Sequence, residues 1–201
     1  HFIGESFENI VAVDSNSACM HYAPSEEIHS KVDSSSSSLL IDSGGQYKYG
    51  TTDTTRTFAL SKPSGEFKKD YTLTLKCLIA LSKAIFLDGA NGRSLDGIAR
   101  KFMWQEGMDY KCGTGHGVSY LGPVHEGPNG FRYKDVYMKN DGAKIVQGMV
   151  TTVEPGVYKE NKYGIRIEND LLCVPYISNE FGTFYKFKTI TYAPIELDSV
   201  E

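Results

Sequence analysis

The sequence has few cysteines and no obvious pairing among them. Its 201 residues include four cysteines, which lie far apart and form no CxxC pair: Cys19, Cys77, Cys112 and Cys173. This usage argues against a disulfide scaffold and favours free thiols in a reducing compartment, the cytosol.

An excess of basic charge and long apolar runs are also lacking. The 21 Lys and Arg residues against 25 Asp and Glu give a net charge of −4, which disfavours a nucleic-acid-binding protein. No apolar run approaches the roughly 18 residues of a membrane helix. The first residues lack the basic start and apolar stretch of a signal peptide. We therefore expect a cytoplasmic domain with neither a nucleic acid nor a membrane as partner.

The composition is that of one ordinary folded domain. Hydrophobic residues make up 40% and charged residues 23% of the chain, and a chain of this length can bury roughly 70% of its unfolded surface. The sequence begins at His1, and its first dozen residues already resemble the interior of a fold. We therefore expect a single domain over 1–201 that is part of a longer protein.

Hydrophobic periodicity predicts an α+β domain, with antiparallel hairpins covered by two helices. The expected helices are 69–87, closed by Asp88-Gly89, and 94–106, with Ser94 as N-cap. The serine-rich stretch 34–38 is predicted to be a solvated loop. The expected strands are 7–13, 39–41, 54–60, 117–121, 131–138, 149–154, 164–173 and 184–193.

Four acidic residues lie at the ends of predicted strands. Asp42 and Asp53 are eleven residues apart, and antiparallel strands can bring such residues side by side. Glu154 and Glu168 each close an apolar strand, although burying a carboxylate is costly unless it is paired or bound to a metal. Either pair alone could be structural, but two such pairs in one chain favour a cation site.

A histidine completes this candidate metal site. His116 lies in the stretch Gly-Thr-Gly-His-Gly, where glycines permit close approach of the backbone. Four carboxylates and one imidazole suit a hard or borderline divalent ion such as Mn²⁺. The four negative charges balance two divalent ions, and a two-metal site can ionise water and assist a hydrolysis.

Short motifs distributed over nearly the whole chain carry a family resemblance. In order along the chain they are 21–24 (HYAP), 41–47 (IDSGGQY), 50–57 (GTTDTTRT), 113–117 (GTGHG), 124–128 (VHEGP), 153–156 (VEPG) and 164–169 (GIRIEN). With these motifs, in the family's order, the sequence resembles the catalytic pita-bread domain of Xaa-Pro aminopeptidase (aminopeptidase P). This resemblance implies a curved antiparallel sheet covered by helices. It also implies a catalytic domain truncated at its N-terminal side, without the upstream helices and N-terminal domains.

The resemblance assigns roles to the five candidate ligands. It implies that Asp42 binds one metal ion, that Asp53 and Glu168 bridge both ions, and that His116 and Glu154 bind the other. Glu154 is also the expected proton shuttle. The expected cofactors are two divalent ions, with Mn²⁺ favoured over Zn²⁺ or Co²⁺.

Further residues are placed around the metals by the same resemblance. His21 and His125 are expected to bind substrate and to assist catalysis. Arg166, two residues before Glu168, is expected to orient a ligand carboxylate. Cys112 stands where many relatives have a histidine that lines the substrate pocket, so contacts with substrate are expected to differ there. Trp104 is either a core or half-buried aromatic or the anchor of a homodimer.

The favoured function is therefore a two-metal aminopeptidase that cleaves between an N-terminal residue and a following proline. Prolidase, which cleaves Xaa-Pro dipeptides, is a same-fold alternative, and methionine aminopeptidase is a weaker one. A non-catalytic binding module of this fold is the alternative from another class. Such modules typically lose metal ligands, whereas all five are present in this sequence.

Overall fold

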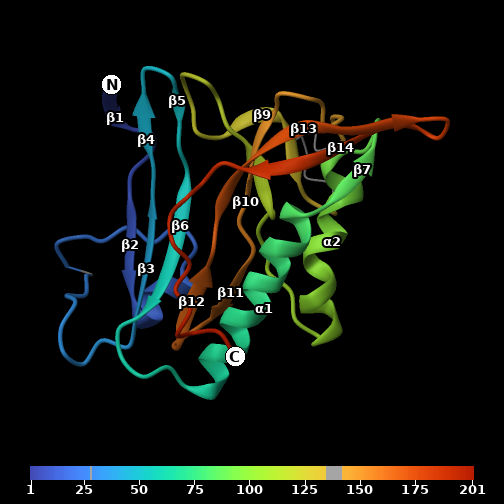
Figure 1. Cartoon of the computed structure of the whole chain (residues 1–201). Coiled ribbons are helices and arrows are strands. Elements are labelled where there is room, and N and C mark those ends of the chain that lie inside the picture. Colours follow the sequence, from blue (N-terminus) through green and yellow to red (C-terminus); the bar gives the residue numbers. More distant parts are fainter. Residues whose placement is uncertain (28, 135–141) are drawn as a thin grey trace.

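The computed structural model describes residues 1–27, 29–134 and 142–201, which form an α+β fold. Two helices lie side by side and cover one side of curved antiparallel sheets (Figure 1). The first strands are β1 (Phe2–Glu5), β2 (Ile10–Val13), β3 (Ser38–Ser43), β4 (Gly45–Tyr47), β5 (Gly50–Thr51), β6 (Thr54–Ala59) and β7 (Ile85–Leu87). The later strands are β8 (Gly115–Gly117), β9 (Glu126–Phe131), β10 (Val150–Val153), β11 (Gly156–Lys159), β12 (Tyr163–Arg166), β13 (Asn169–Asn179) and β14 (Gly182–Thr189).

The predicted hairpin around Asp42 and Asp53 is present. Strand β3 pairs antiparallel with β6, and Asp42 lies opposite Thr55. Asp53 immediately precedes β6, so both aspartates lie at the same end of this pair. The connection is not a tight turn, because β4 and β5 form their own antiparallel pair between the two strands and join β1.

A second antiparallel pair brings Glu154 and Glu168 together. Strand β10 pairs with β13, and Val153 lies opposite Asn169. Glu154 follows Val153 and Glu168 precedes Asn169, so both carboxylates leave the same end of the pair. Strand β10 also pairs with β8, where Thr151 lies opposite Gly117, the residue after His116. The described six-stranded sheet has the order β7-β14-β13-β10-β8-β9.

The helix predicted over 69–87 is wrong at its C-terminal end. Helix α1 spans Gly65–Ser82, and the Ser64 side chain caps it by accepting a hydrogen bond from the Phe67 amide. Residues Ile85–Leu87 instead form β7, which pairs with β14. Phe86 is buried between an exposed Ile85 and an exposed Leu87, so the apolar run follows the twofold period of a strand.

The second helix begins before the predicted position. Helix α2 spans Gly92–Gln105, and its N-cap is Asn91 rather than Ser94. The Asn91 side chain accepts a hydrogen bond from the Ser94 amide, and the Ser94 hydroxyl accepts one from the Asn91 amide. Ser94 is therefore the third residue of the helix and the C-terminal member of a capping box. A serine in that position resembles an N-cap in the sequence.

Several strand predictions also differ from the structure in their boundaries. The predicted strand 164–173 is split into β12 and β13, with Glu168 in the gap. The predicted strand 131–138 is described only over 131–134, and within that part Phe131 alone lies in a strand. Residues 135–138 lie outside the described residues. Strand β8 ends at Gly117, so 118–121 is not a strand. Within the predicted serine loop, Ser36 and Ser38 are buried.

The hydrophobic core lies between the helices and the sheets. Tyr71 and Leu81 of α1 and Ala99 of α2 are fully buried, together with Leu171 of β13 and Phe131 of β9. Strands β10 and β13, whose ends carry the acidic residues, are held in place because their buried side chains pack in this core. In the described ranges no helix is long and apolar enough to span a membrane.

Candidate metal centre

Three of the five predicted ligands converge within 4.8 Å. One ligand atom each from Asp53, His116 and Glu168 lies within this distance of the others. His116 Nε2 also lies 3.4 Å from Asp53 Oδ2 and 3.4 Å from Glu154 Oε1. The distances correspond to side chains facing one shared space rather than to good direct hydrogen bonds.

The His116 ring is fixed so that one nitrogen faces the carboxylates. Its Nδ1 lies 3.0 Å from the carbonyl oxygen of Gly117. A carbonyl can only accept, so Nδ1 carries the proton and Nε2 of the neutral ring has a free lone pair. This is the tautomer that a metal-binding histidine adopts.

The glycines around His116 are required by close backbone approach. A Cβ at Gly115 would lie 1.9 Å from the Thr152 carbonyl oxygen, and one at Gly117 would lie 2.3 Å from that of Glu126. Strand β8 can therefore enter between β9 and β10 only with glycines at these positions. The Gly-Thr-Gly-His-Gly stretch thus places the imidazole at the ends of the acidic strands.

Asp42 joins the centre with one bonded and one unpartnered oxygen. Arg166 Nη2 donates to Asp42 Oδ2 at 2.7 Å, so the predicted contact between Arg166 and a ligand carboxylate is present. Asp42 Oδ1 is buried and has no hydrogen-bond partner among the described residues. Arg166 is held in turn by Thr55 and by the Tyr158 hydroxyl.

The electrostatics of the metal-free cluster are unfavourable. Burial raises the pKa of Glu168 well above its usual range, and the charges of Asp53 and Glu154 raise it further. Burial also raises the pKa of Glu154 to about 6 and raises that of Asp42. Buried carboxylates that face one another hold protons unless a cation is present. Together with the unpartnered Asp42 oxygen, this donor set fits divalent cations that favour oxygen and a single imidazole.

Threonines hold the ligands in place and were missed in the sequence. Thr55 donates its hydroxyl hydrogen to Glu168 Oε2 at 2.7 Å. Thr152 accepts from the His116 amide at 3.1 Å and donates to Glu154 Oε1 at 3.2 Å. Each threonine lies on a strand that directly adjoins a ligand in sequence, since Thr55 is on β6 just after Asp53 and Thr152 is on β10 just before Glu154. This position is the only sequence signal that marks them.

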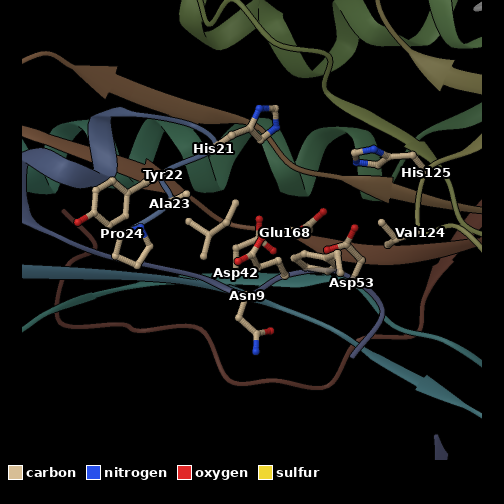
Figure 2. Close-up of a pocket in the computed structure, with 13 residues that line it drawn as sticks. Asn9, His21, Tyr22, Ala23, Pro24, Asp42, Asp53, Val124, His125 and Glu168 are labelled. Atoms are coloured by element: carbon tan, nitrogen blue, oxygen red, sulfur yellow. The ribbon is translucent and has the colours of Figure 1, made fainter. Parts of the chain in front are cut away.

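A cavity of about 270 Å³ opens onto the carboxylates. Figure 2 shows His21 and His125 on the same side of the row formed by Asp42, Asp53 and Glu168, while Asn9 points away. The His125 ring meets the His116 ring edge-on, with 4.1 Å between centroids. The remaining wall is largely apolar and includes Phe7, Ile10, Tyr22, Pro24 and Val124.

Two predicted residues lie away from this cavity lining. Cys112 is half-buried and packs against the hydrophobic core, and burial raises the pKa of its thiol to about 11. Trp104 is 44% exposed on α2 and meets Tyr133 edge-on at 5.3 Å between centroids, so it is not a core residue. The four cysteines are free thiols, as predicted.

Comparison with known proteins decides the family. The model of metallopeptidase family M24 matches residues 1–175. The chain belongs to metallopeptidase family M24. A probable Xaa-Pro aminopeptidase P of Pyricularia oryzae is 51% identical over 169 residues, which cover 84% of this chain and 26% of that protein. A putative Xaa-Pro aminopeptidase of Saccharomyces cerevisiae is 43% identical over 96% of this chain and 25% of that protein.

Solved structures agree with the M24 assignment and with the predicted pita-bread fold. An X-prolyl aminopeptidase of Caenorhabditis elegans, described as a cytosolic enzyme with a di-nuclear active site, matches with a TM-score of 0.90 and 39% identity. The match covers all of this chain and 32% of that one. A prolidase of Pyrococcus furiosus matches with a TM-score of 0.72 and 26% identity, over 91% of this chain and 49% of that one. The chain thus spans about a quarter of the length of the two fungal relatives that it matches.

Proposed function

We propose that the protein is a two-metal aminopeptidase that hydrolyses the bond between an N-terminal residue and a following proline. The observation that carries the proposal is the convergence of Asp53, His116 and Glu168. Asp53 and Glu168 line a cavity that His21 and His125 also line. The names of the M24 relatives, which include Xaa-Pro aminopeptidases from two fungi, support the same activity.

In this proposal the five predicted ligands hold two divalent ions. Asp42 would hold one ion, His116 and Glu154 would hold the other, and Asp53 and Glu168 would contribute to both. Such ions would supply Lewis acidity at the scissile carbonyl and lower the pKa of water at the site. We propose Mn²⁺ as the ion, because the donor set is rich in oxygen and has one nitrogen.

Glu154 has the placement of a proton carrier. Its side chain is partly exposed and faces His116, while Thr152 donates to its Oε1 and fixes its direction. A carboxyl group in this position can take a proton from one side of the site and return it to another. Glu154 would accept a proton from the attacking water and deliver it to the leaving proline nitrogen.

The cavity walls suit a small apolar ring with a carbonyl beside it. Tyr22, Pro24 and Val124 offer apolar contacts to a proline residue, while His21 and His125 flank the carboxylates. The two histidines would hydrogen-bond the substrate carbonyl and the developing negative charge on it. Cys112 is not part of this lining, but its thiol is close enough to Glu154 for the charge of that carboxylate to raise the pKa of the thiol. We propose that from there the thiol, in place of a larger donor, alters contacts on the proline side.

The setting of the enzyme is also part of the proposal. We propose a cytoplasmic protein, in line with its free thiols and with the description of the Caenorhabditis elegans relative as cytosolic. We propose a homodimer with Trp104 at the contact, because this aromatic side chain is 44% exposed.

Peptide length separates the proposed activity from that of a prolidase. The natural full-length protein, loaded with Mn²⁺, is expected to cleave Xaa-Pro-Yaa tripeptides and longer peptides faster than the dipeptide Xaa-Pro. The physical reason is that residues after proline contribute binding energy in the transition state. The measurement is kcat/KM for a matched tripeptide and dipeptide, with Xaa-Ala-Yaa as the control for proline specificity.

Equal or faster turnover of the dipeptide would identify a prolidase instead, the activity of several M24 structural neighbours. A protein that holds no metal ions by elemental analysis and turns over none of these peptides would favour the non-catalytic binding module.

A further inference from the structure

Another buried carboxylate, that of Asp170, lies next to the predicted metal ligands. Asp170 is the second residue of β13, two residues after Glu168, and it lies opposite Thr152 of β10. Its side chain is only 4% exposed. Asp170 therefore adds another buried acid near the predicted ligands, and none of the predicted roles uses it.

Asp170 holds the main chain of a metal-binding residue. Its Oδ2 accepts a hydrogen bond from the backbone amide of Asp53 at 3.3 Å. Asp53 lies between β5, which ends at Thr51, and β6, which begins at Thr54, so its amide has no place in a strand ladder. A buried amide needs an acceptor, and here a side chain supplied from 117 residues further along the chain provides it.

The main chain of Asp170 is itself held by hydrogen bonds to the segment that follows β14. Its amide donates to the Thr191 hydroxyl at 2.8 Å, and its carbonyl accepts from the Ile190 amide at 3.0 Å. Arg56 fixes the preceding stretch through the Glu168 carbonyl and the Asn169 side chain. The direction of the Asp170 carboxylate is thus set by the strand and by the segment packed against it.

An amide acceptor alone does not require a carboxylate. The second oxygen, Asp170 Oδ1, is buried and has no hydrogen-bond partner among the described residues. An unpaired anionic oxygen at such a position is costly unless positive charge is nearby. The neighbouring side chains Asp53 and His116 are the predicted metal ligands, so bound cations would supply that charge.

We propose that Asp170 is a positioning residue of the metal centre. Its carboxylate holds the backbone of Asp53 and so aims the Asp53 side chain at the space that it shares with His116 and Glu168. Its negative charge also favours cations in that space. The inference rests on the metal binding that the proposed function requires.

Two substitutions of Asp170 separate its charge from its hydrogen bond. Asp170→Asn keeps an acceptor oxygen and removes the charge, whereas Asp170→Val removes both. Calorimetric titration of the metal-free natural protein with Mn²⁺ is expected to show affinity about 10-fold lower for Asp170→Asn and lower still for Asp170→Val. The visible absorption bands of bound Co²⁺ are expected to shift in both variants, because the ligand geometry changes.

A matched control comes from another aspartate that accepts backbone amides. Asp14 Oδ1 accepts from the amides of Ser37 and Ser38, at the end of β3 remote from Asp42. Asp14→Asn makes the same chemical change and is expected to leave Mn²⁺ affinity and the Co²⁺ bands as in the wild type. Thermal unfolding of all variants without metal measures their stability separately.

The possible outcomes decide the inference. Weakened Mn²⁺ binding in Asp170→Val alone supports the positioning role and assigns it to the hydrogen bond. Wild-type affinity and wild-type Co²⁺ bands in both variants would overturn it, whether or not their stability falls, and would leave the proposed function intact. Absence of Mn²⁺ and Co²⁺ binding by the wild-type protein would overturn the inference and the proposed function together.

Discussion

At the scale of single residues, the site depends on side chains that are fixed by a hydrogen bond at one atom and leave another atom facing the shared space. His116 is bonded through Nδ1 and open at Nε2, and Asp42 is bonded through Oδ2 and open at Oδ1. Glu154 is held by Thr152 in the same manner. Side chains fixed in this way are pre-organised for a shared ligand, because little conformational freedom is lost when it binds.

Glu154 gives the sharpest prediction at this scale. Glu154→Gln is expected to lower kcat by about 100-fold or more, because an amide cannot carry the proton. The fold should survive, since the substitution keeps the size of the side chain. The measurements are kcat on an Xaa-Pro-Yaa peptide and the far-ultraviolet circular dichroism spectrum.

The control for this variant is Glu160→Gln, the same chemical change at an exposed glutamate that follows β11. It is expected to leave kcat unchanged. Retention of more than a few per cent of activity in Glu154→Gln would mean that another group carries the proton.

At the scale of elements, capping decides where the helices begin. Asn91 and Ser94 exchange hydrogen bonds at the start of α2, and that helix packs against α1 over the core. Arg100 of α2 then donates to Asp96 and to the carbonyls of Tyr110 and Cys112. Helix α2 thereby supports the segment that leads into His116, so its stability bears on the site.

The cap can be tested directly. Asn91→Ala is expected to lower the free energy of unfolding by about 1 kcal/mol, because the Ser94 amide loses its acceptor. The measurement is urea-induced unfolding followed by circular dichroism. Asn91→Asp, which retains a capping oxygen, is the control and should stay near the wild type; an equal loss in both variants would show that the cap is not the cause.

At the scale of the whole molecule, the acidic centre makes the metal-free fold sensitive to pH. Burial raises the pKa of Glu154 to about 6 and that of Asp170 to about 7. Burial lowers the pKa of His116, but the nearby carboxylates of Asp53 and Glu154 outweigh this and raise it. The folded state therefore keeps protons that the unfolded chain releases at lower pH.

The sign of the effect follows from proton binding. Because the folded state binds more protons, the free energy of unfolding should fall as pH rises from about 4 to about 7. Glu66 acts in the opposite direction, since hydrogen bonds from Lys159 and Lys162 lower its pKa to about 2, but its effect lies below this window. With a chelator present, the urea midpoint should be higher at pH 5 than at pH 7.5.

Added Mn²⁺ should raise the midpoint at pH 7.5 much more than at pH 5, because ion binding requires deprotonated carboxylates. A chelated protein that is more stable at pH 7.5 than at pH 5 would contradict this account of the centre.

The sequence by itself determined the chemical identity of the site. An acid that closes an apolar strand is conspicuous, as at Asp42 and Glu154, and a histidine between glycines is conspicuous in the same way. The motifs around them carry the resemblance to the pita-bread domain of Xaa-Pro aminopeptidase, and hydrophobic periodicity already predicts the α+β class. Local patterns also predict both helices, but they extend the first helix over Ile85–Leu87, because three residues are too few to distinguish a twofold period from a helical one.

Only the tertiary structure decided how these residues are held. Asp170 looked like an ordinary polar residue after Glu168, and its bond to the Asp53 amide spans 117 positions of sequence. Thr55, Thr152 and Tyr158 likewise gain their roles from strands paired far along the chain. Sequence patterns reflect local period and residue chemistry, whereas the partner of a buried polar atom depends on which strands the hydrophobic core brings together.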